Sequence, residues 1–224
     1  MSQYVIHTMP KRLWYVNEYL IPSMLEQGIN RNNITVFNDD KKLGNLQACL
    51  ECFSQLPEEG STWHLQDDVI ISHDFTQVTE IPFNENTIAC GFCSRLYDKE
   101  NPPGIVSPLE MWFSFQCILI PNRMARECVS WVRKCIIGNP VYTKYWDKGL
   151  NDDWCFRSYI RTEYPNCSII NITPNIVDHI DWLIGGSVAS DFIRTQEFRS
   201  RYWNDIYLID ELERKLKKCH FGQH

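Results

Sequence analysis

The spacing of apolar and polar residues along the first part of the chain predicts strands and helices in alternation. Short apolar runs are typical of buried strands, and apolar residues repeated every three or four positions are typical of helices that pack on one side. The pattern predicts strands over residues 4–8, 33–37 and 62–65 and helices over about 11–27 and 43–56. Pro22 lies inside the first helix and predicts a kink or an early break there. Such alternation with short connections indicates a parallel sheet covered by helices on both faces.

The same alternation continues through the rest of the chain. Apolar runs and helical periodicity predict strands over 87–92, 115–120 and 167–171 and helices over about 122–137 and 151–161. Residues 173–187 lack both periods and are predicted as a loop or turn-rich segment, whereas residues 190–224 form an amphipathic helical pattern of mixed charge. We therefore expect one α/β domain over residues 1–189, with a helical extension over 190–224 that packs on it.

Polar and acidic side chains follow each of the first three predicted strands. The strand ends carry His7-Thr8, Asn38-Asp39-Asp40 and Gln66-Asp67-Asp68. Ligands of parallel α/β sheets bind beyond the carboxyl ends of the strands. The convergence of these three polar segments therefore predicts a ligand site at this edge of the sheet.

Two adjacent carboxylates, Asp67 and Asp68, lie between the apolar stretches 63–65 and 69–71. Burial and mutual repulsion would raise their pKa values, and a divalent cation would remove both costs. Their hard oxygen atoms suit Mg²⁺ or Mn²⁺, which also bind the phosphates of a substrate. The alternative is an exposed turn that begins with an Asp pair, but such a turn is more often flanked by Gly, Pro or Ser. The apolar flanks therefore favour a site.

Composition and charge limit the broad class of protein. The length of 224 residues, 44% of them hydrophobic, suits one globular domain. The formal net charge of −6 argues against a general electrostatic grip on a polyanion, although it leaves a local basic groove open. The N-terminus does not resemble a signal peptide and no apolar stretch reaches the length of a membrane span, so we expect a cytoplasmic protein.

The ten cysteines lie mostly within apolar runs. Two C-x-x-C pairs are present, but Cys49/Cys52 lies in a helical pattern and Cys90/Cys93 in a strand-like one, whereas zinc knuckles need turns. Buried free thiols are therefore favoured over a zinc site or disulfides, which remain the alternatives.

Several segments resemble motifs of the GT-A nucleotide-sugar transferases. Residues 63–69, Trp-His-Leu-Gln-Asp-Asp-Val, look like the hydrophobic strand and Asp-x-Asp or Glu-Asp-Asp motif of that family, and residues 44–50 are similar to the helix that precedes the motif. Residues 151–154, Asn-Asp-Asp-Trp, resemble the acceptor-side acidic motif, and residues 174–181 resemble a late loop with a histidine. The resemblance spans about residues 4–185 and implies a GT-A fold, a Rossmann-like mixed sheet flanked by helices.

The resemblance implies specific roles for the acidic pair and the late histidine. Asp68 would be the principal ligand of Mn²⁺ or Mg²⁺, and His179 would complete the metal shell, as in some members of the family. The alternatives are a turn residue for Asp68 and a surface hydrogen-bonding residue for His179. Gln66 replaces the first acidic position of the usual triplet, which keeps an inactive or metal-independent relative open.

The same resemblance implies a nucleotide pocket at the strand ends. Its expected lining residues are His7, Thr8, Arg12, Asn38, Asp39 and Asn45, with Asp67 oriented toward the ribose or the sugar. Arg12 has a second interpretation as a plain charge on a helix surface.

Asp152 and Asp153, at the start of a predicted helix, are the candidate catalytic residues. Either one could deprotonate an acceptor hydroxyl in a direct displacement, which slightly favours an inverting reaction. The alternative is that they cap the helix. One Asp could cap while the other catalyses.

The implied function is transfer of a sugar from a nucleoside-diphosphate donor, with a UDP-sugar favoured, to an acceptor hydroxyl. The acceptor is either a glycan or a hydroxymethylated DNA base, as in small stand-alone transferases of bacteriophages. Residues 123–161 interleave Lys and Arg with aromatic residues, a mixture that suits a polynucleotide or an ordinary solvated helix face. The rival functions are a nucleotidyltransferase and an inactive nucleotide-sugar-binding module, and the oligomeric state is left open.

Overall fold

Two β-sheets organise the part of the chain that the structure describes. The computed structural model describes residues 2–92, 105–106, 115–137, 139, 151–172, 175–180 and 184. The strands are β1 (Gln3–Thr8), β2 (Ile34–Asn38), β3 (Ser61–Gln66), β4 (Val69–Ile71), β5 (Thr87–Cys90), β6 (Ile105–Val106), β7 (Cys117–Pro121), β8 (Ser168–Asn171) and β9 (Val177–His179). Seven of them form one sheet in the order β2-β1-β3-β7-β5-β8-β6, and β4 pairs with β9 in a second sheet.

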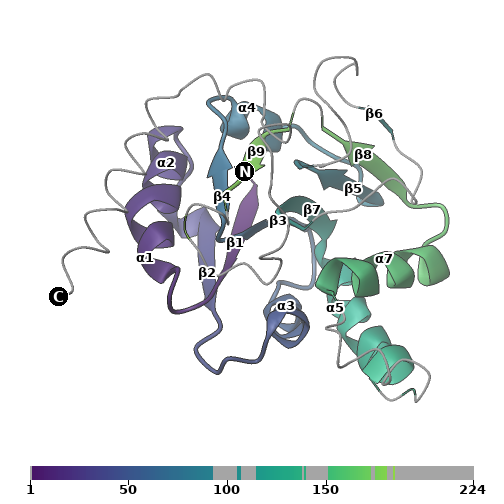
Figure 1. The fold of residues 1–224 in the computed structure, drawn as a ribbon. Helices are drawn as coiled ribbons and strands as arrows, with labels where there is room; N and C mark the ends of the chain where they lie inside the picture. The colour runs from purple at the N-terminus through teal and green to yellow at the C-terminus, as the bar shows by residue number, and fades with distance from the viewer. Residues whose placement is uncertain are drawn as a thin grey trace.

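Helices cover both faces of the large sheet (Figure 1). They are α1 (Leu13–Tyr15), α2 (Ile21–Glu26), α3 (Asn45–Ser54), α4 (Phe75–Thr79), α5 (Asn122–Val132) and α7 (Asp152–Glu163), with π-helical turns at Val16–Leu20 and Arg133–Ile137 and a 3₁₀ turn at Arg31–Asn33. The predicted strands and helices of the described residues are all present, with bounds shifted by a few residues.

The alternation of side chains along β1 explains the three layers. Tyr4 and Ile6 lie in the hydrophobic cluster beneath α2, whereas Val5 lies in the cluster beneath α3, α5 and α7. Successive residues of a strand point to opposite faces, so an unbroken apolar run needs cover on both sides. The resulting order is helix, sheet, helix.

The sheet is parallel where the candidate site lies. β1 pairs in parallel with both β2 and β3, and Tyr4 lies opposite Ile34 on one side and Trp63 on the other. β7 then joins β3 in the antiparallel direction, which makes the whole sheet mixed. The three strands that end in polar residues therefore end at one edge.

The first helical segment deviates from an ordinary α-helix just before its proline. A π-helical turn, Val16–Leu20, separates α1 from α2, and Pro22 occupies the first turn of α2. A proline has no N–H to donate to the preceding turn, so the hydrogen-bond ladder changes there. The expected break at Pro22 takes the form of this wider turn.

The prediction of a loop over residues 173–187 was wrong for Val177–His179. These residues form β9, which pairs antiparallel with β4 and places His179 opposite Val69. A three-residue strand with two polar positions gives no alternation to recognise, and the pairing depends on β4, a long-range partner. This small sheet positions the late histidine.

Gly91 allows the segment before β9 to approach the large sheet. A Cβ atom at this position would lie 2.7 Å from the Cys117 sulfur and 2.8 Å from Cγ1 of Ile176. The Gly91 carbonyl also accepts a hydrogen bond of 2.8 Å from the Ile176 N–H. The missing side chain is therefore what lets this segment cross the end of β5.

The described cysteines carry free thiols. Cys49 and Cys52 lie buried on α3, and burial raises the pKa of Cys52 to about 12, so this thiol stays protonated. Cys93 and the expected extension over 190–224 lie outside the described residues, and the domain division stays a prediction. None of the helices that the structure describes has the length and apolar character to cross a bilayer.

Candidate functional site

The carboxyl ends of β1, β2 and β3 meet, and their polar residues contact one another. The Thr8 carbonyl accepts a hydrogen bond of 2.8 Å from the Asp39 N–H, and the Thr8 hydroxyl donates one of 2.8 Å to Oδ2 of Asp67. The structure thus joins residues from three separate strand ends, at the edge where the sequence predicts a ligand site.

A buried arginine lies between the two adjacent carboxylates. Nη1 of Arg12 lies 2.8 Å from Oδ1 of Asp67 and 2.8 Å from Oδ2 of Asp68. The three residues are 4%, 4% and 7% exposed. Arg12 follows β1 by a short turn, so it reaches the acids at the same edge of the sheet. One guanidinium therefore offsets part of the charge of two buried acids.

Asp67 also anchors the segment that follows β1. Its Oδ2 accepts hydrogen bonds from the Thr8 hydroxyl and from the Met9 N–H, at 2.8 and 3.2 Å. Burial and the neighbouring Asp68 raise the pKa of Asp67, while Arg12 and Thr8 act in the opposite direction. These contacts give Asp67 a structural role besides any contact with a ligand.

His179 is brought to Asp68 by the pairing of β4 with β9. Its Nε2 lies 3.0 Å from Oδ2 of Asp68, and its side chain is 4% exposed. The imidazole also meets the Phe92 ring edge to face at 6.2 Å. The Ile180 N–H donates to the Asp68 carbonyl at 2.8 Å, which fixes the two segments side by side. The two expected metal ligands are therefore neighbours.

The chemistry of these side chains fits a divalent cation. Two carboxylates and an imidazole are ligands for Mn²⁺ or Mg²⁺, and the two carboxylates already hold a positively charged group, the Arg12 guanidinium. Over the described ranges, no three His, Cys, Asp or Glu side chains are already spaced to hold a metal. The donor types are thus suitable, but Arg12 lies among them.

Asp39 shapes the loop that leads into α3. Its Oδ1 accepts a hydrogen bond from the Leu43 N–H at 2.9 Å and its Oδ2 one from the Gly44 N–H at 3.3 Å. Gly44 has a φ of 84°, a left-handed conformation that favours glycine, directly before the first residue of the helix. Asp39 therefore holds the start of α3 beside the strand ends.

Asn45, the first residue of α3, points to a second buried acid. Its side-chain Nδ2 donates a hydrogen bond of 2.9 Å to Oδ1 of Asp152 at the start of α7. The sequence places Asn45 in the nucleotide pocket and Asp152 at the acceptor side. The structure links the two positions directly.

Asp152 is a buried carboxyl with an unusual proton affinity. It is 4% exposed, and burial, followed by the charge of Asp153, raises its pKa to about 7. Within the described residues, its Oδ2 makes no hydrogen bond. Asp152 is therefore close to half-protonated at neutral pH and has one oxygen available for a further contact.

The structure supports only part of the alternative in which residues 151–153 cap the helix α7. Asn151 occupies the N-cap position of α7 but makes no side-chain capping hydrogen bond. Oδ1 of Asp152 instead accepts from the Asp153 N–H at 3.0 Å, and Oδ1 of Asp153 accepts from the Trp154 N–H at 2.6 Å. Both acids therefore satisfy N–H groups of the first turn, where negative charge is favourable.

His7 and Asn38 complete the polar edge. The His7 ring meets the Phe37 ring edge to face at 5.6 Å, and burial lowers the pKa of His7 to about 4 despite Asp39 and Asp68. His7 is therefore neutral at pH 7. Oδ1 of Asn38 is buried and, among the described residues, makes no hydrogen bond. The two residues come from neighbouring strands, with His7 opposite Phe37 and Asn38 opposite Thr8 in the register of β1 and β2.

The contacts that sequence reasoning missed are those between side chains. It assigned Arg12 to the nucleotide and did not pair it with Asp67 and Asp68. The sequence did contain a sign of this pairing, because Arg12 follows the first predicted strand and the third predicted strand leads into Asp67 and Asp68 at the same edge of the sheet. The pairing of Asn45 with Asp152 had no such signal, because the two lie in distant parts of the sequence.

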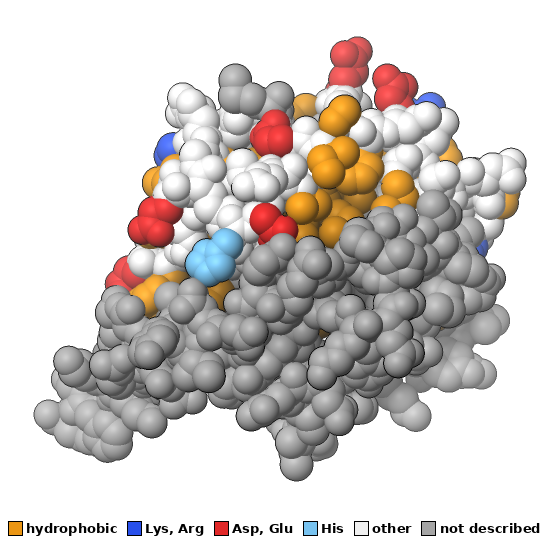
Figure 2. Space-filling view, turned by 90° about the horizontal axis from the view of Figure 1, so that it is seen from above, with side chains coloured by type: hydrophobic (Ala, Val, Ile, Leu, Met, Phe, Trp, Pro, Cys, Tyr) orange, Lys and Arg blue, Asp and Glu red, His pale blue; other side chains and the backbone are white. Residues whose placement is uncertain are grey.

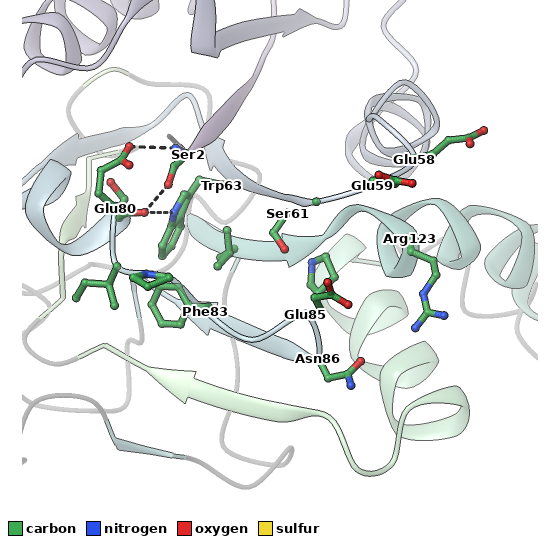
Figure 3. A pocket seen from close by; sticks show the side chains of 16 residues that line it. Ser2, Glu58, Glu59, Ser61, Trp63, Glu80, Phe83, Glu85, Asn86 and Arg123 are labelled. Atoms are coloured by element: carbon green, nitrogen blue, oxygen red, sulfur yellow. Dashed lines mark hydrogen bonds between the residues drawn. The ribbon is translucent and has the colours of Figure 1, made fainter.

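The structure also contains a pocket of about 920 Å³ at the opposite end of β1 and β3. Figure 3 shows its glutamates Glu58, Glu59, Glu80 and Glu85 with Arg123 around Trp63 and Phe83. Figure 2 shows acidic and hydrophobic side chains side by side on the face that carries α4. Ser61 begins β3 and Asp67 directly follows its last residue, so the strand separates the two by about 20 Å. This pocket is therefore separate from the acidic pair.

No protein-family model matches the sequence, and no curated protein is detectably similar to it in sequence. Solved structures resemble the fold, among them the following three at 10% sequence identity. The apo form of the glycosyltransferase GlyE of Streptococcus pneumoniae TIGR4 has a TM-score of 0.50 over 100% of this chain and 64% of GlyE. The galactosyltransferase LgtC, in complex with donor and acceptor sugar analogs, has a TM-score of 0.49 over 95% of this chain and 96% of LgtC. The inositol-1-phosphate CTP transferase of T. maritima has a TM-score of 0.47 over 96% of each chain.

The similarity to GlyE confirms the predicted fold, the α/β arrangement of GT-A glycosyltransferases. The chain spans 64% of the length of GlyE. The other two similarities are weaker and add nothing to the assignment. At 10% identity a shared fold does not transfer an activity, which has to be argued from the site.

Proposed function

We propose that this chain is a metal-dependent glycosyltransferase that moves a sugar from a nucleoside-diphosphate donor to an acceptor hydroxyl. The observation that carries the proposal is the contact of Asp68 with His179, with Asp67 joined to Asp68 through Arg12, at the carboxyl ends of parallel strands in a GT-A fold. A UDP-sugar is the favoured donor. This edge is where α/β sheets of this kind bind nucleotides.

The acidic pair supports a role for Mn²⁺ or Mg²⁺. Asp68 and His179 would hold the ion, with Asp67 beside them, since their side chains lie together in a buried cluster. When bound, such an ion stabilises the negative charge of a departing diphosphate. The chain's own contribution is to hold the two carboxylates in the turn between β3 and β4 and the imidazole on β9, which pairs with β4.

A continuous chain of contacts supports a common site for the acids and Asp152. Asp67 contacts Thr8, and the Thr8 carbonyl accepts from Asp39. Asp39 holds the start of α3, where Asn45 contacts Asp152. In a direct displacement, Asp152 would accept the proton of the acceptor hydroxyl. A base with a pKa of about 7 is matched to neutral pH, because it is basic enough to take a proton and is half ionised.

The acceptor is proposed by class only. A glycan hydroxyl and the hydroxymethyl group of a modified DNA base both offer the nucleophile that this arrangement requires. The described part of the basic and aromatic stretch lies on α5, the π-helical turn Arg133–Ile137 and α7, where Trp131 donates a hydrogen bond to Glu163 and Tyr159 one to Glu127. We propose the glycan first, since these aromatic side chains are engaged within the protein.

The test is nucleotide release from a panel of UDP-sugars, measured with and without Mn²⁺ for the full chain and two variants of α7. Asp152→Asn removes the candidate base and is expected to lower turnover by about 10²–10⁴-fold. Glu163→Gln, at the exposed far end of the same helix, is the matched control and is expected to retain turnover.

Three other outcomes would contradict the proposal. Pyrophosphate release from UTP or CTP would indicate the nucleotidyltransferase. Donor binding without turnover would indicate the inactive binding module. Equal turnover of the Asp152→Asn variant and the unmodified chain would remove Asp152 from the reaction.

A further inference from the structure

Arg12 occupies the position that a cation shared by Asp67 and Asp68 would take. One nitrogen, Nη1, lies 2.8 Å from an oxygen of each carboxylate. Mn²⁺ or Mg²⁺ bound to these same oxygens would lie about 2.0–2.2 Å from them. The guanidinium and a divalent ion would then be in contact, with like charges, in a region where the side chains are at most 10% exposed. A divalent ion that takes both of these oxygens therefore competes with the guanidinium for them.

We propose that Arg12 is an intrinsic counter-ion that competes with the divalent metal for Asp67 and Asp68. The inference rests on the metal site of the proposed function and assigns Arg12 a role there, as the side chain that must leave when the metal binds. While Arg12 is in place, the buried acids are partly neutralised without metal. Metal affinity is therefore weaker than the carboxylates alone would give.

The contacts around the pair allow such an exchange. Asp67 holds Thr8 and Met9 through Oδ2, whereas Arg12 uses Oδ1. Departure of the guanidinium thus leaves the other anchors of Asp67 in place. Arg12 lies between β1 and α1, so the exchange requires a change in its side chain and not in a strand or helix. On the other carboxylate, Oδ2 of Asp68 faces both Arg12 and His179.

The test is a titration of Mn²⁺, followed by the electron paramagnetic resonance of the free ion, with no nucleotide present. The full chain is compared with Arg12→Gln, which removes the charge, and with Arg12→Lys, which keeps it on a single nitrogen. Arg31→Gln is the matched control, since Arg31 lies on the exposed turn before β2. We expect Arg12→Gln to bind Mn²⁺ at least about tenfold more tightly than the full chain. Arg12→Lys is expected to fall between the two, and Arg31→Gln to match the full chain.

A thermal melt with and without Mn²⁺ covers the case in which the loss of Arg12 weakens the fold. Arg12→Gln leaves two adjacent buried acids, so its melting temperature should fall without metal and recover when Mn²⁺ is added. The unmodified chain should respond less to the metal. If Arg12→Gln does not fold without Mn²⁺, recovery of the fold on addition of Mn²⁺ supports the exchange of Arg12 for the metal. The titration of Arg12→Lys then measures how much Arg12 weakens the Mn²⁺ affinity.

Equal or weaker Mn²⁺ affinity in both Arg12 variants would overturn the inference, and so would an absence of Mn²⁺ binding in every variant. Nucleotide release measured in EDTA distinguishes a failure of this inference from a failure of the proposed function. Turnover that persists in EDTA would leave sugar transfer in place but contradict its metal dependence, whereas equal Mn²⁺ affinities with metal-dependent turnover would remove the competition alone. Absence of both donor binding and turnover would remove the proposed function itself.

Discussion

At the scale of single residues, Asp67 and Asp68 are adjacent in sequence but differ in what they hold. Asp67 accepts from Arg12, Thr8 and Met9, so it ties the segment after β1 to the end of β3. Asp68 contacts Arg12 and lies beside His179. The first is expected to matter more for stability and the second more for the reaction.

Asp67→Ala is expected to lower the free energy of unfolding by about 3–5 kcal/mol, because it leaves part of the Arg12 charge uncompensated and removes two further acceptor contacts. Asp68→Ala keeps those contacts and is expected to cost less. Urea unfolding of the two variants measures the difference. A larger loss in Asp68→Ala than in Asp67→Ala would contradict these roles.

Asp152 predicts a particular dependence of stability on pH. Its pKa is raised from 3.8 to about 7 in the folded chain, so the folded state binds more protons than the unfolded state between these values. The contribution of this carboxyl to stability therefore falls as the pH rises from about 4 to about 7 and is constant above that range. The pKa difference corresponds to a change of up to about 4 kcal/mol.

Asp152→Asn should remove this dependence, because its amide does not ionise. We expect the variant to be more stable than the full chain at pH 8 and close to it at pH 4, in urea unfolding at both pH values. A pH dependence that is unchanged by the substitution would show that Asp152 is not the group that titrates.

At the scale of secondary structure, the elements with strong local patterns could be predicted and the others could not. β1, β3 and β7 are apolar runs long enough to be recognised, and burial on both faces is typical of strands inside an α/β sheet. β4 and β9 are three residues each and owe their pairing to tertiary contacts. The position of His179 therefore depends on an element that local sequence does not reveal.

Gly91 is expected to be essential for the approach of the segment that precedes β9. Gly91→Ala places a Cβ atom 2.7 Å from the Cys117 sulfur and 2.8 Å from the Ile176 side chain, which should cost about 1–3 kcal/mol of stability. Cys117→Ala removes one of the two clashes, so the double variant should lose less than the sum of the single losses. Urea unfolding of Gly91→Ala, Cys117→Ala and the double variant gives the free energies for this double-mutant cycle. Strict additivity would contradict the crowding at this position.

At the scale of the whole molecule, the fold class could be predicted from the sequence, but the strand order and the arrangement within the site could not. Alternating strands and helices predict a sheet with polar residues at one edge, and the edge is where the structure places them. The insertion of Arg12 between Asp67 and Asp68, and the contact of Asn45 with Asp152, depend on side-chain geometry that periodicity does not encode.

The most direct test of the proposed site is the affinity for UDP, measured by isothermal titration calorimetry with Mn²⁺ and with EDTA. We expect Mn²⁺ to strengthen UDP binding to the full chain at least about tenfold, as in other couplings between two ligands. Asp68→Ala should abolish this gain, whereas Glu26→Gln, an exposed change at the end of α2, should preserve it. UDP binding with the same metal dependence in Asp68→Ala, or no UDP binding to the folded chain in either condition, would contradict the account.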